Sequence, residues 1–213
     1  MNVAVLGAGT VGSGIAQASA TAGHDVVLRD VETEDVERGL ETIADTLREE
    51  MAPAAREEAL ARITGTSDLA AIAAADLVVE AVPEEVELKK EAIAAAERAT
   101  DGAILASHTS SLPLTGIASA LSDPSTAIGL HFFGPVHVMD LVEIVVAERT
   151  SDETRAFVEE FVADIEKEPI VVRDAPGFTT SRLGVAVGVE AIRMLEQGVA
   201  GPRAIDRAMA LGY

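Results

Sequence analysis

The stretch Val3-Ala4-Val5-Leu6-Gly7-Ala8-Gly9-Thr10-Val11-Gly12 decides the fold of this chain. Its first four residues predict a buried strand, and residues 11–22 have the period of an amphipathic helix. A Gly-x-Gly-x-x-Gly turn between a strand and a helix is the fingerprint of a dinucleotide-binding unit. Gly7 permits the tight turn, Gly9 lets the backbone approach a pyrophosphate, and Gly12 lets the helix lie close to the strand.

The cofactor expected on this turn is NAD. Thr10 and Val11 open the helix, so their backbone N–H groups and the positive helix end face the pyrophosphate. Asp30 ends the second predicted strand eighteen residues after Gly12, near the spacing of about 20 for the acid that binds the ribose 2′-hydroxyl. A carboxylate there repels a 2′-phosphate, which favours NAD over NADP. Arg29 precedes it, and strand alternation predicts that its side chain takes the opposite face.

Short apolar runs alternate with longer amphipathic stretches along the chain, which predicts an α/β fold. We expect a Rossmann-type, doubly wound, mostly parallel sheet. Strands are expected near residues 2–6, 25–29, 63–66, 77–80, 104–107, 127–131, 141–146 and 169–172. Helices are expected near residues 11–22, 34–51, 54–61, 84–99, 113–120 and 152–165.

The pattern changes after Asp174-Ala175-Pro176-Gly177 to two helices, near 180–196 and 202–211, without further strands. We therefore predict an NAD-binding domain over residues 1–175 and the first helices of an all-α second domain over 176–213. A unit of about 37 residues lies below the approximate 40 that fold unaided. Either the chain is a fragment, or these helices dock on the first domain.

Composition excludes several classes of protein. The 36 acidic residues outnumber the 16 basic ones and give a formal charge of -20, which disfavours nucleic acid as a partner. The chain has no cysteine, so disulfides and thiolate metal sites are absent, and we predict no metal. Its apolar runs are shorter than the roughly 20 residues that span a bilayer, and no secretion signal starts at Met1. These features predict a cytoplasmic protein that does not enter membranes.

Several longer blocks occur in a fixed order. They are Val3 to Gly23, Val79 to Glu84, Ser107 to Leu112, Gly129 to Pro135, Leu141 to Val145 and Pro176 to Phe178. In this order they resemble the 3-hydroxyacyl-CoA dehydrogenase family over essentially the whole chain. The resemblance implies an NAD-dependent oxidoreductase with a helical domain after the nucleotide-binding domain.

The resemblance also implies catalytic residues. His131 matches the general base that takes the proton of the substrate 3-hydroxyl, and Glu143 matches the acid that orients it and stabilises its charge. Ser110 matches the serine that hydrogen-bonds the reacting hydroxyl. By themselves these residues have ordinary interpretations, since His131 suits a satisfied core or turn histidine and Ser110 suits a helix cap.

Two further residues are implied as cofactor contacts. Glu84 and Lys89 match an acid and a lysine of the family, and Lys89 is one of only three lysines in the chain. The alternative is that both are surface residues of one helix.

Three positions depart from the resemblance. His108, Gly134 and Ser181 stand where the family usually has asparagine, which removes three amides from the expected pocket. Asn2 is the only asparagine in the chain, so a general avoidance of asparagine is one explanation and a change at the site is the other. A protonated His108 offers two hydrogen-bond donors that could compensate.

The function implied is the interconversion of L-3-hydroxyacyl-CoA and 3-oxoacyl-CoA with NAD, in fatty-acid or short-chain acyl-CoA metabolism. The expected partners are an acyl-CoA substrate and, if the full helical domain is present, a second copy in a homodimer. One alternative is a dehydrogenase of a free hydroxy acid or sugar acid. The other is a truncated, non-catalytic NAD-binding module.

The acid-rich, lysine-poor composition also resembles that of proteins from salt-loving microbes. We expect the melting temperature to rise between about 0.1 M and about 1 M KCl, because the Debye length falls from about 10 Å to about 3 Å and screens the self-repulsion. Calorimetry over this range is the measurement. A nonionic solute at equal osmolality is the control, and an equal rise in both would contradict a charge effect.

Overall fold

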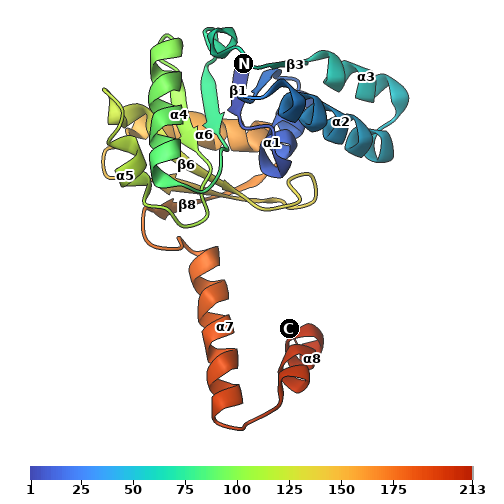
Figure 1. Cartoon of the computed structure of the whole chain (residues 1–213), viewed down its shortest axis with the longest axis vertical. Helices are drawn as coiled ribbons and strands as arrows, with labels where there is room; N and C mark the ends of the chain where they lie inside the picture. Colours follow the sequence, from blue (N-terminus) through green and yellow to red (C-terminus); the bar gives the residue numbers. More distant parts are fainter. Residues whose placement is uncertain (213) are drawn as a thin grey trace.

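The computed structural model describes residues 1–212 as one eight-stranded sheet with helices on both faces, followed by two further helices (Figure 1). The strands are β1 (Asn2–Leu6), β2 (Asp25–Arg29), β3 (Ile63–Thr66), β4 (Leu77–Glu80), β5 (Ile104–Ser107), β6 (Ala127–Phe132), β7 (Leu141–Val146) and β8 (Glu168–Arg173). The helices are α1 (Thr10–Thr21), α2 (Thr33–Glu50), α3 (Pro53–Ala61), α4 (Val86–Ala99), α5 (Leu114–Ala118), α6 (Asp152–Asp164), α7 (Thr180–Glu196) and α8 (Pro202–Gly212).

The strand order is β3-β2-β1-β4-β5-β6-β7-β8. The chain moves outward in one direction from β1 to β3 and then in the other direction from β4, so β1 and β4 flank the topological switch point of the sheet. Neighbouring strands are parallel in the described sheet except for β6 and β7, which are antiparallel. In an open α/β sheet a ligand binds beyond the carboxyl ends of the strands at such a switch point.

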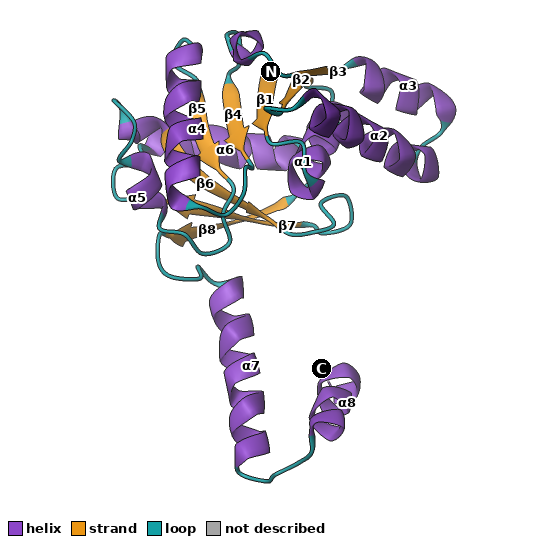
Figure 2. Ribbon diagram, viewed as in Figure 1, coloured by secondary structure: helices purple, strands orange, loops and turns teal. Residues whose placement is uncertain are grey.

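Helices cover both faces of the sheet (Figure 2), and two apolar layers hold them there. Val3 and Val5 point to one face, where they join side chains of α1, α2 and α6. Ala4 and Leu6 point to the other face, where they join side chains of α4 and α5. Burial on both faces explains why the strands are continuous apolar runs in the sequence rather than alternating patterns.

The β1–α1 turn depends on two glycines. Gly7 has a φ of +106°, and a Cβ there would lie 2.5 Å from the carbonyl oxygen of Ala81 at the end of β4. A Cβ on Gly12 would lie 1.8 Å from the carbonyl oxygen of Gly7. No side chain fits at either position, so the helix approaches the strand as the glycine pattern predicts.

The last two helices leave the sheet layer. Figure 1 shows α7 projecting away from the strands, and no residue of α7 is buried. In the described chain α7 therefore does not pack along the sheet or the helices that cover it. None of the described helices is long and apolar enough to cross a bilayer.

The predicted elements agree closely with the structure. Every predicted strand is present, and only β6 and β8 extend further, each by one or two residues. The predicted helix at 113–120 is shorter, because α5 ends at Ala118. Two 3₁₀ turns at Leu69–Ile72 and Pro124–Thr126 were not predicted. Each begins where an aspartate side chain accepts a backbone N–H two residues later, which is a local turn signal with no helical period.

Replacing Gly12 with alanine tests the close approach of α1 to β1. We expect Gly12→Ala to lower the free energy of unfolding by about 1–3 kcal/mol, because its methyl group must displace the backbone of Gly7. Gly116→Ala is the matched control in α5, since a Cβ there meets only Pro113, with Cγ at 3.6 Å. Urea unfolding of both variants is the measurement, and equal stabilities would contradict the steric argument.

Candidate active site and dinucleotide groove

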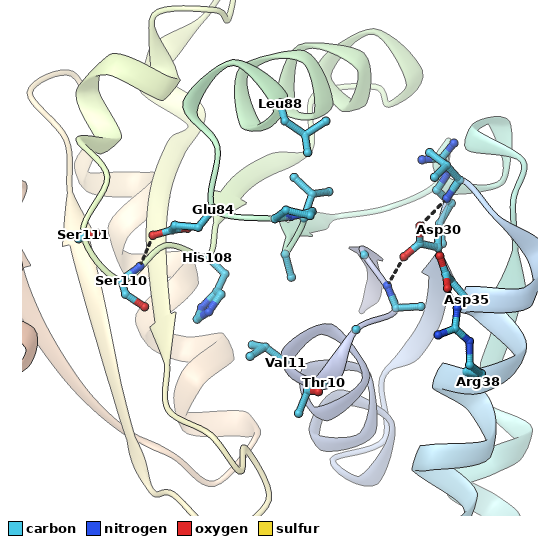
Figure 3. A pocket seen from close by; sticks show the side chains of 18 residues that line it. Thr10, Val11, Asp30, Asp35, Arg38, Glu84, Leu88, His108, Ser110 and Ser111 are labelled. Carbon is cyan, nitrogen blue, oxygen red and sulfur yellow. Dashed lines mark hydrogen bonds and ion pairs between the residues drawn. The ribbon is translucent and has the colours of Figure 1, made fainter.

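A groove of about 810 Å³ lies beyond the carboxyl ends of β1, β2, β4 and β5. Figure 3 shows Asp30 and Arg38 at one end of it and Glu84, His108 and Ser110 at the other, with Thr10 and Val11 between them. The groove thus crosses the switch point of the sheet. An extended ligand with two ends fits this shape better than a compact one.

The middle of the groove suits a pyrophosphate. Gly9 immediately precedes α1, has no side-chain cap, and a Cβ on it would meet no atom within 4 Å. The space next to the helix N-terminus is therefore open, and the first backbone N–H groups of α1 point toward it. This arrangement binds an anion without a basic side chain.

The end of the groove at β2 carries both acidic and basic side chains. Asp30 Oδ2 accepts from Ala8 N at 2.7 Å and Oδ1 accepts from Val31 N at 2.7 Å, so the carboxylate is fixed beside the glycine turn. Arg29 and Arg38 also line this end. The Arg29 side chain is directed to the segment after β3, because its Nε donates to Ser67 O at 3.3 Å. Arg38 forms an ion pair with Asp35.

A buried ion pair holds the walls on the other side of the switch point. Lys89 is fully buried, and its Nζ donates to Glu80 Oε1 at 2.9 Å, to Val82 O at 3.1 Å and to His108 O at 2.6 Å. Ser107 Oγ donates to Glu80 Oε2 at 2.5 Å. Burial raises the pKa of Glu80, and Lys89 and Ser107 oppose that shift. The network ties the end of β4 to the end of β5.

This position corrects the expected contact between Lys89 and the cofactor. A lysine with three acceptors on its ammonium and no exposed surface does not face the groove. Neither is it a surface residue of α4. Lys89 shapes the groove through the loops that it joins.

Glu84 does line the groove. Its Oε1 accepts from Thr109 Oγ1 at 2.6 Å and from Ser110 N at 3.0 Å. Burial raises the pKa of Glu84, but the hydrogen bonds from Thr109 and Ser110 and the charge of Lys89 outweigh it, so the pKa lies below its usual value. Glu84 thus fixes the backbone of the segment that presents the Ser110 side chain.

His131 and Glu143 meet because of the antiparallel strand pair. In the β6–β7 register the two residues are directly opposite, so their side chains share one face of the sheet. His131 Nδ1 lies 2.6 Å from Glu143 Oε2. His131 is almost fully buried, and Glu143 is fully buried. Since Nδ1 is engaged by the carboxylate, Nε2 remains for a ligand.

Two threonines at the start of α7 complete the shell of Glu143. Glu143 Oε1 accepts from Thr179 N at 3.1 Å and Thr180 N at 3.0 Å, and Oε2 accepts from Thr180 Oγ1 at 2.8 Å. Burial raises the pKa of Glu143, but the hydrogen bonds from His131, Thr180 and Thr179 outweigh it and lower the pKa below its usual value. A buried carboxylate with this many donors stays ionised.

A cavity of about 360 Å³ adjoins the groove and contains the histidine. It shares Val11, His108 and Ser110 with the groove. The ring centroid of His131 lies 4.4 Å from that of Phe133 and 5.8 Å from that of Phe178. The remaining lining residues are Phe132, Gly134, Thr180 and Ser181. The histidine therefore lies in a partly apolar cavity that opens onto one end of the groove.

His108 lies between the groove and the cavity. Its Nδ1 is 3.1 Å from Leu130 O and 3.3 Å from Phe132 N, and its ring centroid is 5.8 Å from that of His131. Burial lowers the pKa of His108 to about 4, and nearby His131 and Lys89 add to this effect. The imidazole is neutral near pH 7, so it does not act as the protonated double donor suggested from the sequence.

Family models match nearly the whole chain. The model described as the NAD binding domain of 3-hydroxyacyl-CoA dehydrogenase matches residues 2–175, and the model of the C-terminal domain matches residues 177–213.

The chain belongs to the 3-hydroxyacyl-CoA dehydrogenase family.

Relatives from distant organisms support this family membership. A probable 3-hydroxybutyryl-CoA dehydrogenase of Deinococcus radiodurans is 40% identical over 100% of this chain and 78% of the relative. The mitochondrial hydroxyacyl-coenzyme A dehydrogenase of Rattus norvegicus is 39% identical over 99% of this chain and 71% of the relative. The crystal structure of (S)-3-hydroxybutyryl-CoA dehydrogenase from Ralstonia eutropha superposes with a TM-score of 0.95 at 39% identity, covering 99% of this chain and 77% of that structure.

These findings confirm the predicted family, the Rossmann-type fold and NAD as the cofactor. The structure brings most of the expected site residues together. The groove collects Gly7, Gly9, Thr10, Val11, Asp30, Glu84 and Ser110, and the cavity collects His131 with Ser110. Gly12 and Lys89 support the groove from behind it.

Sequence reasoning missed three contributors, namely Glu80, Thr180 and Arg38. Glu80 ends an otherwise apolar strand, and a charge at the end of a buried strand is a usable signal. Thr180 begins a helix, where threonine is interpreted as an ordinary helix-start residue. Arg38 reaches the groove only because α2 packs against α1 and β3, and no local pattern marks it.

The neutral state of His108 predicts a pH effect on stability. A histidine whose pKa falls from 6.5 in the unfolded chain to about 4 in the folded chain binds fewer protons when folded, so the free energy of unfolding falls as the pH falls through this window. Between pH 7 and pH 5 we expect the free energy of unfolding of the original chain to fall by up to about 2 kcal/mol more than that of the His108→Asn variant. Urea unfolding at both pH values is the measurement. Carboxylates titrate alike in both proteins, so an equal loss would contradict a neutral His108.

Proposed function

We propose that this chain interconverts L-3-hydroxyacyl-CoA and 3-oxoacyl-CoA with NAD. One observation carries the proposal, which is the buried His131–Glu143 pair in a cavity that opens onto the dinucleotide groove. An alcohol dehydrogenation needs a base at the hydroxyl and a hydride acceptor at the adjoining carbon. The pair and the groove supply these two positions side by side.

His131 is the proposed general base. Its Nε2 takes the proton of the substrate 3-hydroxyl during oxidation and returns it during reduction. Glu143 holds Nδ1, which fixes the tautomer and stabilises the imidazolium that forms. Phe133 and Phe178 pack around the ring and limit the access of water to it.

Ser110 is the proposed second contact to the reacting oxygen. It is exposed, lies at the junction of groove and cavity, and its backbone is fixed by Glu84. NAD held in the groove would supply the hydride acceptor for carbon 3, and His131 Nε2 would take the hydroxyl proton. Oxidation of the alcohol to the ketone thus removes one hydride from carbon 3 and one proton from the hydroxyl.

The proposed cofactor contacts follow the groove. The backbone of Gly7, Gly9, Thr10 and Val11 faces the pyrophosphate, with Gly12 allowing the approach. Asp30 accepts a hydrogen bond from the adenosine ribose, and Glu84 contacts the cofactor at the opposite end of the groove. Arg29 and Arg38 lie near Asp30, but the Asp30 carboxylate repels a 2′-phosphate and so favours NAD over NADP.

The substrate class is supported by the relatives, whose printed names include 3-hydroxybutyryl-CoA and 3-hydroxyadipyl-CoA dehydrogenases. The amide lost at Ser181 supports a second candidate, a free hydroxy acid or sugar acid, because serine is too short to reach a thioester carbonyl. We also propose that the protein is cytoplasmic and forms a homodimer when the full helical domain is present. The exposed apolar side chains along α7, such as Leu183, Val187 and Ile192, support an association through the helical part.

The base is tested with His131→Gln. We expect kcat for the reduction of acetoacetyl-CoA by NADH to fall at least about 10²-fold, the low end of what a positioned acid–base group contributes. NADH binding should be unchanged, because the substituted side chain lies in the cavity rather than in the groove. Activity assays and fluorescence titration of NADH are the measurements.

The same assay separates the alternatives. Acetoacetate at equal concentration is the comparison substrate, and a preference for it over acetoacetyl-CoA would favour the free acid. NADH binding without turnover of either substrate would favour a non-catalytic module. Full activity in His131→Gln would contradict the role proposed for the histidine.

A further inference from the structure

We infer that Thr180 is a positioning residue for this reaction, because its hydroxyl holds the Glu143 oxygen that orients His131. The inference rests on the proposed function. Thr180 is the first residue of α7 and lies 37 positions from Glu143 in the sequence. No catalytic motif in the sequence includes it.

The hydrogen bonds of Glu143 single out this side chain. The carboxylate accepts four described hydrogen bonds, two on each oxygen. Those on Oε1 come from the backbone of Thr179 and Thr180, which any residue except proline supplies. Those on Oε2 come from two side chains, the imidazole of His131 and the hydroxyl of Thr180. Only the latter bond can be removed by mutation without removing the base.

Both side chains donate to the same oxygen atom. Oε2 lies 2.6 Å from His131 Nδ1 and 2.8 Å from Thr180 Oγ1. The two donors fix the position of Oε2 between β6 and the first turn of α7, and this position decides the angle of the imidazole. Without the hydroxyl, Oε2 is held by the imidazole alone, and only Oε1 remains bonded to the start of α7.

The hydroxyl also adjusts the charge balance of the pair. It stabilises the ionised carboxylate and contributes to the lowered pKa of Glu143. The titratable groups around this contact are His131 and Glu143 themselves, with His108 at 5.8 Å from the His131 ring. A carboxylate with one donor fewer interacts more strongly with the remaining donor, which favours the protonated imidazole. Removal of the hydroxyl should therefore move the pH profile as well as the rate.

Thr180→Val tests the inference with nearly no change in shape. We expect kcat for acetoacetyl-CoA reduction to fall about 10-fold, as for other groups that orient a reacting residue, while the KM for NADH stays the same. The midpoint of the basic limb of kcat/KM against pH for this reduction, where His131 loses the proton that it must donate, should rise by a few tenths of a unit. Thr180→Ser keeps the hydroxyl and should restore both the rate and the profile.

A matched control separates this from a general loss of a hydroxyl. Thr46→Val makes the same change in α2, where the hydroxyl only donates to Thr42 O of its own helix at 2.9 Å, and it should leave kcat and the profile unchanged. Thermal unfolding of all three variants checks that the fold is intact. A folded Thr180→Val enzyme with the kcat and pH profile of the original chain would overturn the inference, as would a loss that serine does not restore.

A spectroscopic test is independent of turnover. The proton on His131 Nδ1 should give a low-field NMR signal in the unmodified chain, assigned by its absence in His131→Gln. We expect this signal to shift or broaden in Thr180→Val and to return in Thr180→Ser. An unchanged signal in Thr180→Val would overturn the inference even if the chain acts on no acyl-CoA, whereas a shifted signal without turnover would count against the proposed function alone.

Discussion

A carboxylate that is buried in a protein must be surrounded by hydrogen-bond donors. Two such carboxylates organise the edge of the sheet beyond the carboxyl ends of its parallel strands. Glu80 and Glu143 have no exposed surface. Glu80 is held by Lys89, Ser107 and the backbone N–H of Val82. Glu143 is held by His131 and the start of α7. Because an unpaired buried charge costs several kcal/mol, each acid forces the segments that satisfy it into place.

The two acids serve different parts of the site. The network of Glu80 fixes the loops after β4 and β5, and through Lys89 it fixes the backbone of His108, so it shapes the wall of the dinucleotide groove. Glu143 fixes the imidazole and the first turn of α7. The helical extension that leaves the sheet layer in Figure 1 therefore begins directly on the acid–base pair. A change in how α7 leaves the domain would act on His131 through this contact.

The sheet topology explains why chemistry gathers at one edge. Parallel strands bring the glycine turn, the end of β2 and the loops after β4 and β5 to a common side. The single antiparallel pairing in the described sheet then places a histidine opposite a glutamate next to that groove. His108 occupies the junction as a neutral imidazole. It adds a polar surface between cofactor groove and cavity without adding charge.

The amino-acid sequence was enough to establish the strand–turn–helix unit, the alternation of strands and helices, the acid at the end of β2 and, through ordered blocks, the family. These features are local in the sequence, since a glycine turn between a strand and a helix and a run of buried apolar residues are recognised from neighbours a few positions away. The position of Lys89, the entry of Arg38 into the groove and the contact of Thr180 with Glu143 emerged only when the chain was folded. Each depends on residues that lie far apart in the chain and meet because the strands pair in one register and the helices pack in one order, which no local pattern encodes.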